Sequence, residues 1–222
     1  MTDMNHIVSA AVIAGALLCA TPAAAQAPPA PGRSDGRLFL GGSAGVGGAG
    51  KTGGLAGGEL AFRVTEQIDV FGEAVGIQDL VTTPRRALAT QVGSYLATSQ
   101  GRAVSGSIKV PALYAGGGLR IRLTTASGVY PYVSGGAGTA RLTLTPMFVL
   151  GGADVTASLA QYGVTLGSDV TGTQTKPAVT GGLGVRAVHS RWYLDVGVRV
   201  LTVFTDQRVN FVGVGAGVGF RF

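Results

Sequence analysis

The C-terminal stretch of the chain alternates strictly between apolar and small residues. One parity consists of Val212, Val214, Ala216, Val218, Phe220 and Phe222, whereas the other is almost entirely glycine. Because successive side chains of a strand point to opposite faces, this pattern predicts a strand with one apolar face and one nearly bare face. Such a strand fits a soluble sandwich, or a transmembrane barrel whose apolar face meets lipid.

The same alternation recurs in seven earlier segments. The eight predicted strands cover approximately residues 37–47, 57–65, 68–78, 107–123, 129–145, 176–188, 191–204 and 210–222. Short turns alternate with two long connections, 79–106 and 146–175, and the second could hold a short helix near 154–162. This alternation of turn lengths is typical of bacterial outer-membrane barrels. The sequence therefore predicts an all-β fold, an eight-stranded antiparallel up-and-down transmembrane β-barrel, or ten strands if a long connection hides a hairpin.

The N-terminus has the pattern of an export signal. Residues 7–20 are apolar, and Ala23-Ala24-Ala25 offers a cleavage site after small residues. Residues 1–25 are therefore predicted to be a cleaved signal peptide, with translation starting at Met1 or Met4. Residues 26–36 are predicted to form a disordered periplasmic lead-in, and 37–222 the barrel. The only cysteine, Cys19, lies in the leader, so the mature chain would have no disulfides.

Composition excludes several classes of protein. The chain contains no run of 18 or more apolar residues, so no transmembrane helix is predicted. The formal net charge is +6, from 17 basic and 11 acidic residues. On a membrane barrel this excess is expected to serve pairing in the lumen and contacts with lipopolysaccharide phosphates, and no nucleic-acid partner is predicted.

Ten charged residues are predicted to face the lumen. They are Glu59, Arg63, Asp69, Glu73, Arg120, Arg122, Arg141, Arg186, Asp195 and Arg199. Charges inside an eight-stranded barrel must be paired or hydrated, and such a lumen is narrow enough for side chains to fill it. Two interpretations stay open: a structural network that rigidifies the barrel, and a narrow path for small solutes or ions that favours anions.

The opposite parity supplies a predicted aromatic girdle near the periplasmic interface, formed by Tyr130, Tyr132 and Trp192. In the segment 129–145 this assignment turns Tyr130, Tyr132, Leu142 and Leu144 toward lipid and Arg141 toward the lumen.

Motifs for catalysis and cofactor binding are weak. Residues 45–52 match the P-loop pattern GxxxxGK[ST], but a glycine-rich stretch follows where the motif requires a helix. The only histidine after the leader, His189, lies in a predicted periplasmic turn without an acid-base partner on the outer face. No Cys, His and Asp cluster has metal-ligand spacing. We expect a protein that is not an enzyme and has no cofactor or metal.

The chain resembles the small outer-membrane β-barrel family that includes the OmpA transmembrane domain, OmpX and OmpW. The resemblance rests on residues 116–122, 130–138, 192–199 and 217–222, and it covers about residues 37–222. It implies a bacterial outer-membrane location, a monomeric protein, and a C-terminal assembly signal at Val218, Phe220 and Phe222 that the barrel assembly machinery reads. Members of the family variously brace the envelope, adhere or pass small molecules, so a structural or surface role and a narrow channel both remain as hypotheses.

Overall fold

The computed structural model describes residues 37–124, 128–168 and 170–222. They belong to one compact unit, Asp35–Phe222. The predicted signal peptide and the lead-in 26–36 lie outside the described residues. Within the described part of the chain, no helix has both the length and the apolarity needed to cross a membrane.

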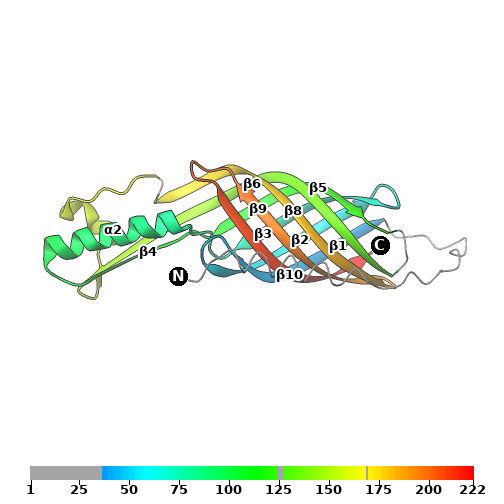
Figure 1. Cartoon of the computed structure of the whole chain (residues 1–222), viewed down its shortest axis with the longest axis horizontal. Coiled ribbons are helices and arrows are strands. Elements are labelled where there is room, and N and C mark those ends of the chain that lie inside the picture. The colour runs from blue at the N-terminus through cyan, green and yellow to red at the C-terminus, as the bar shows by residue number, and fades with distance from the viewer. Residues whose placement is uncertain (1–36, 125–127, 169) are drawn as a thin grey trace, which may run out of the picture. The chain divides into compact units, whose positions relative to one another are not determined.

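Eight antiparallel strands form a closed barrel (Figure 1), which confirms the predicted fold class. The barrel strands are β1 (Leu38–Gly48), β2 (Thr52–Arg63), β3 (Ile68–Ile77), β5 (Ala112–Arg122), β6 (Val129–Leu150), β8 (Gly172–His189), β9 (Trp192–Val203) and β10 (Val209–Arg221). The first and last strands, β1 and β10, pair along their length, and the pairing of β6 with β8 completes the circuit. Two further short strands, β4 (Val104–Lys109) and β7 (Ala153–Asp154), pair with β6 outside this circuit.

Alternation along each strand separates the two faces of the wall. Leu119, Leu183, Val196 and Val214 are each about half exposed on the outer face. Inward positions are often glycine, and at Gly118 the reason is steric: a Cβ there would lie 2.1 Å from the backbone oxygen of Gly135 on the neighbouring strand. Glycine therefore lets β5 and β6 approach each other closely on the concave side of the wall.

The two long connections form a folded extension, where the sequence predicted a polar connection at 79–106 and mostly irregular chain at 146–175. The first connection contains α2 (Thr83–Gln100) and β4, and β6 continues beyond the barrel to Leu150 to pair with β4. The second contains β7 and the 3₁₀ helix η2 (Thr156–Tyr162), close to the predicted short helix. The predicted strand 107–123 is thus two strands, which pair with β6 in the same register on either side of a break at Val110 and Pro111.

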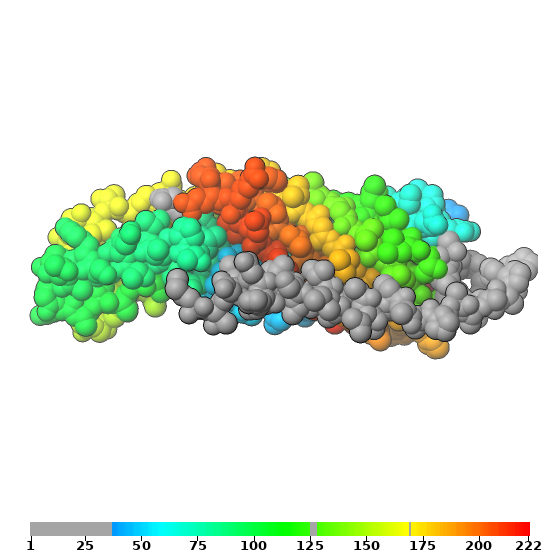
Figure 2. All heavy atoms as spheres, viewed as in Figure 1, coloured from blue at the N-terminus to red at the C-terminus, as the bar shows by residue number. Residues whose placement is uncertain are grey.

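Helix α2 packs on β4 through small residues. Ala89, Gly93 and Leu96 are buried on the inner face of the helix. A Cβ on Gly106 of β4 would lie 2.4 Å from the backbone oxygen of Ala89, so only glycine permits this close approach. The other face of α2 is exposed, and the helix and β4 lie together at one end of the view (Figure 2). The helix begins with proline in its first turn and ends at Gly101, whose φ of 62° is favourable for glycine.

Candidate functional site

The lumen holds nine of the ten charged residues that the sequence assigned to it. Arg141 is the exception: it is exposed on the outer face of β6, so its predicted place in the lumen is wrong. The nine form three ion-paired groups along the barrel axis, beginning at the end where the strands are joined by short turns.

The first group surrounds Asp69, which is fully buried. Arg122 donates hydrogen bonds from Nη2 to both carboxylate oxygens, at 2.9 and 3.0 Å. Arg63 lies 3.6 Å from the same carboxylate. The guanidinium of Arg122 also lies 4.3 Å from the ring centroid of Tyr130, within the range of a cation–π contact.

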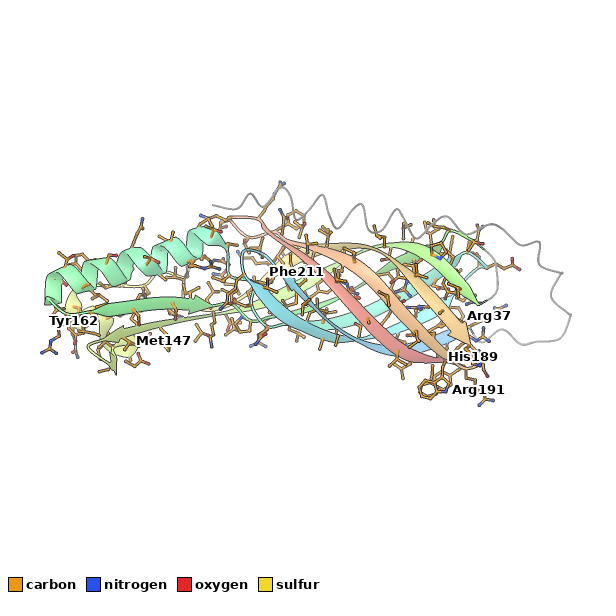
Figure 3. The ribbon with its side chains drawn as sticks, turned by 60° about the horizontal axis from the view of Figure 1, so that its bottom comes forward. Arg37, Met147, Tyr162, His189, Arg191 and Phe211 are labelled. Carbon is orange, nitrogen blue, oxygen red and sulfur yellow. The ribbon has the colours of Figure 1, made fainter. Side chains whose placement is uncertain are left out.

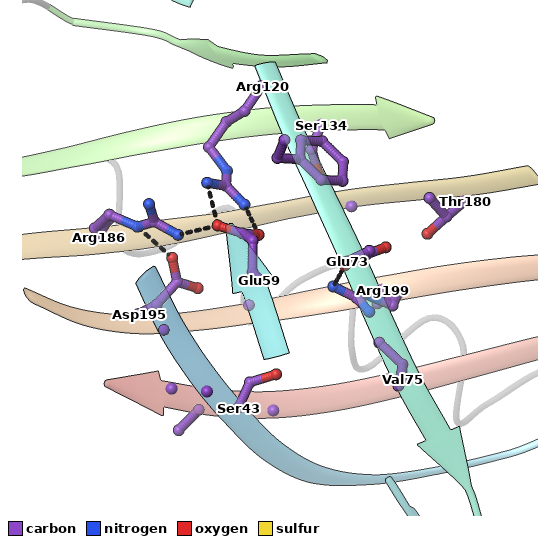
Figure 4. Close-up of a pocket in the computed structure, with 18 of the residues that line it drawn as sticks. Ser43, Glu59, Glu73, Val75, Arg120, Ser134, Thr180, Arg186, Asp195 and Arg199 are labelled. Carbon is purple, nitrogen blue, oxygen red and sulfur yellow. Dashed lines mark hydrogen bonds and ion pairs between the residues drawn. The ribbon is translucent and has the colours of Figure 1, made fainter. Parts of the chain in front are cut away.

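The second group joins charged residues from four strands (Figure 4) with a tyrosine from a fifth. Glu59 on β2 accepts hydrogen bonds from both terminal nitrogens of Arg120 on β5 and, at 3.2 Å, from Arg186 on β8. Arg186 also donates from Nε to Asp195 on β9 at 2.7 Å. Tyr132 on β6 donates its hydroxyl hydrogen to the same Asp195 at 2.7 Å. Arg186 is only 2% exposed, so this network links strands from opposite sides of the barrel around a desolvated arginine.

The third group is the ion pair between Glu73 and Arg199, whose nitrogen and oxygen are 2.5 Å apart. It borders a cavity of about 80 Å³, which the second group also lines, together with hydroxyl-bearing side chains such as Ser134 and Thr180 (Figure 4). Positive and negative side chains alternate around this space, so the cavity is polar but carries little net charge.

Tyr130 and Tyr132 point into the lumen, which corrects their predicted place in a lipid-facing girdle. They are 3% and 7% exposed, and Leu142 and Leu144 on the same strand are also buried. The register explains the parity: Arg122 pairs with Tyr132 and Arg120 with Ser134 across β5 and β6, and paired residues share a face. The ring of each tyrosine lies against an inward arginine, a contact between strands that the parity of a single strand does not reveal.

Beyond the ion pairs, toward the long connections, the lumen is apolar. Leu55, Val75, Tyr114, Leu142 and Phe211 belong to one buried cluster that continues under the start of the extension through Leu80 and Val110. Figure 3 places Phe211 near this end, and Arg37, His189 and Arg191 at the opposite end. The sequence did not predict this layer, because its members come from seven barrel strands, from β4 and from residues assigned to a loop.

One buried acid that the sequence analysis missed secures the base of the extension. Asp79 follows β3, and its Oδ1 accepts hydrogen bonds from the backbone of Val81 and of Val110, each at 3.0 Å. It therefore ties the start of the first long connection to its end. The only sequence signal was an isolated acid directly after a strand.

The extension has its own small core. Leu96 of α2, Phe148 and Leu150 of β6, and Val155 and Leu159 around η2 are buried together. At the tip, hydrogen bonds from the side chain and backbone of Thr156 hold the pKa of the exposed Asp154 below its ordinary value. Figure 3 shows Met147 and Tyr162 at this end, far along the ribbon from His189.

The remaining candidates from the sequence take their places as follows. The P-loop match spans the β1–β2 hairpin, so no helix follows its Lys51-Thr52 and no phosphate cradle forms.

Trp192 is exposed at the short-turn end, and its ring centroid lies 3.5 Å from that of Phe220. Val218, Phe220 and Phe222 are exposed along β10 and at its end, and their role as an assembly signal stays a prediction. Among the described residues, no cluster of three metal-ligating side chains occurs.

The closed barrel and its turn lengths agree with the family that a comparison of the sequence identifies. The chain matches the model of the outer membrane protein beta-barrel domain over residues 10–222. The chain belongs to this family. Its location is accordingly the bacterial outer membrane. Because such barrels have short periplasmic turns and longer outer loops, we expect the long connections on the outer side.

Three similar solved structures have low sequence identity, and the first of them shows the same fold. Neisserial surface protein A is 15% identical with a TM-score of 0.53, and the match covers 83% of this chain and 97% of that one. The N-terminal β-barrel domain of Pseudomonas aeruginosa OprF is 15% identical, with a TM-score of 0.49 and coverage of 85% and 100%. Ail, the attachment invasion locus protein of Yersinia pestis, is 13% identical, with a TM-score of 0.45 and coverage of 85% and 99%. No curated protein matches the chain.

Proposed function

We propose that this protein is a non-enzymatic outer-membrane barrel whose closed wall anchors a folded extension at the cell surface, where the extension makes the protein's external contacts. One observation carries the proposal: both long connections fold into a single body with its own core, outside the barrel circuit. Loops that only join strands do not need an 18-residue helix packed on a strand through glycine.

The interior of the barrel supports an anchoring role. Three ion-paired groups fill one part of the lumen, and an apolar cluster from seven barrel strands fills the next. Ions entering from outside would have to cross the apolar cluster without polar partners, which is costly. A narrow channel, the alternative function, is favoured only by the cavity of about 80 Å³ beside Glu73 and Arg199.

The proposal can be tested by removing the extension at positions where its ends already meet. Leu80 donates its backbone N–H to Val110 at 2.8 Å, and Leu144 pairs with Gly172. A short glycine-containing turn can therefore replace 81–109, and a second can replace 145–171. The shortened barrel should still insert in the outer membrane and show heat-modifiable gel mobility.

The functional comparison uses a deletion strain complemented with the full-length or the shortened chain. We expect both to restore resistance of the envelope to detergent, and only the full-length chain to restore attachment of the cells to protein-coated surfaces. If the shortened chain restores attachment fully, the extension is not the interacting part. If the deletion strain attaches normally, the proposed surface role is wrong.

A further inference from the structure

The lipid-facing wall contains one charged residue that the sequence had placed inside. Within the described residues, the outward faces of the eight barrel strands are apolar or small apart from hydroxyl and amide side chains near their outer ends, His189 at the periplasmic end, and Arg141. All other Asp, Glu, Lys and Arg residues of these strands share the parity of the lumen. A charge on this face is costly in mid-membrane and nearly free at the interface, so the height of Arg141 matters.

Arg141 lies at the outer edge of the apolar band. It is twelve residues beyond Val129, which is exposed at the periplasmic start of β6. At about 3.3 Å per residue and a strand tilt of about 40°, these twelve residues span roughly 30 Å along the barrel axis. The apolar band of such a barrel is only about 25 Å tall. Leu113, directly opposite Arg141 on β5, is 53% exposed and belongs to the apolar band. The guanidinium is therefore at the level of the lipid headgroups of the outer leaflet.

Hydrogen-bond donors surround Arg141 on the same face. Thr175 on β8 pairs with Arg141, and Thr173 pairs with Thr143 one step outward. Lys109 of β4 lies opposite Thr145, four residues farther along β6 than Arg141, or about 13 Å along the strand. These residues are exposed, and β4, β6 and β8 contain no acidic residue. Arg141 has no ion-pair partner in the described part of the chain.

We propose that Arg141 and Lys109, with the threonines between them, bind a phosphate group of lipopolysaccharide in the outer leaflet. Arginine presents a planar fork of donors that matches a phosphate, lysine adds a point charge, and the threonine hydroxyls complete the donor set. A phosphorylated glycolipid is the occupant because the site lies on the lipid-facing wall at headgroup height, at the outer edge of the apolar band that includes Leu113. The site lies at the base of the extension, since Lys109 ends β4, and it does not depend on the external contacts proposed for the rest of the extension.

Binding of purified lipopolysaccharide to the full-length refolded protein in detergent micelles tests the assignment. The variants are Arg141→Gln, which removes the charge, Arg141→Lys, which keeps it, and Arg191→Gln, a control at an exposed arginine in the periplasmic turn. We expect Arg141→Gln to weaken binding about tenfold, as expected for loss of a charge-assisted hydrogen bond, and Arg141→Lys to weaken it less. Arg191→Gln should bind like the wild type.

The lipid is varied in parallel to identify the group that is bound. Dephosphorylated lipopolysaccharide should bind the wild type as weakly as intact lipopolysaccharide binds Arg141→Gln. Equal binding of intact lipopolysaccharide by the wild type and Arg141→Gln, with heat-modifiable mobility retained by both, would overturn the site. Equally tight binding of phosphatidylglycerol would overturn the assignment to lipopolysaccharide. If Arg141→Gln does not fold, Lys109→Gln provides the same comparison.

Discussion

At the scale of single residues, the interior depends on charges that have been removed from water together. Arg186 contacts two carboxylates, Glu59 and Asp195, and its guanidinium lies 4.2 Å from the ring centroid of Tyr193. Burying such a group is favourable only while its partners remain, because an unpaired buried charge has lost its hydration without compensation.

Replacing Arg186 with methionine should therefore destabilise the barrel by about 3–5 kcal/mol, since Glu59 loses one partner and Asp195 its only arginine. The measurement is urea-induced unfolding of the refolded protein in detergent. Arg208→Met, at an exposed arginine outside the barrel strands, is the control and should change the free energy of unfolding by less than about 0.5 kcal/mol. Equal effects of the two substitutions would show that the network does not stabilise the barrel.

Two neighbouring glycines provide a test of steric packing in the wall. Gly118→Ala should destabilise the barrel by about 1–3 kcal/mol, because its Cβ would meet the backbone of β6. Gly135→Ala is the matched control: its Cβ would have no atom within 4 Å, so the change should be neutral or slightly stabilising. Urea unfolding of both variants checks this, and a similar loss at both positions would contradict the steric explanation.

At the scale of elements, the extension is decided by packing between segments that are distant in sequence. The segment 83–100 contains a proline near its start and a glycine after its end, which suit a helix, but its apolar residues are few. It becomes a helix against β4 because Gly93 and Gly106 allow the two backbones to approach. Strand β4 in turn exists because β6 continues past the barrel to pair with it.

Gly106→Val should separate α2 from β4 without opening the barrel, because the added side chain would collide with Ala89 and the ring of Phe148. Trypsin should then cleave near Arg86 or Arg102 at least about tenfold faster, since local opening exposes these sites. Heat-modifiable mobility should remain. Ser107→Val, on the opposite and exposed face of β4, is the control, and equally fast cleavage of that variant would argue against the glycine contact.

At the scale of the whole molecule, two kinds of side-chain packing block the lumen. Ion pairs fill it toward the periplasm, and apolar side chains fill it toward the outside. This arrangement predicts that the full-length protein is silent in planar lipid bilayers at moderate voltage. Arg120→Gln and Arg199→Gln should also remain silent, because the apolar cluster around Phe211 and Leu142 stays in place. Steady anion-selective conductance of the wild type, altered in Arg120→Gln, would instead support the narrow channel.

The sequence by itself determined the barrel and most of the inward charges. Strict alternation fixes which side chains share a face within a strand, and in β5 and β9 one face is so clearly apolar that it must meet lipid. In β6 both parities mix polar and apolar residues, so the pattern could not say which one faces inward. The pairing with β5 decided it, and it moved Tyr130 and Tyr132 into the lumen and Arg141 out to the lipid.

Only the tertiary structure decided how the long connections fold. Their apolar residues are too scattered to form a periodic pattern, and they become a core only when α2, the end of β6 and η2 meet. Local sequence reports which face a strand offers, because that depends on neighbours two positions away. Partners distant in the sequence are chosen by the packing of the whole, and that choice created the extension, the apolar layer of the lumen and the exposed place of Arg141.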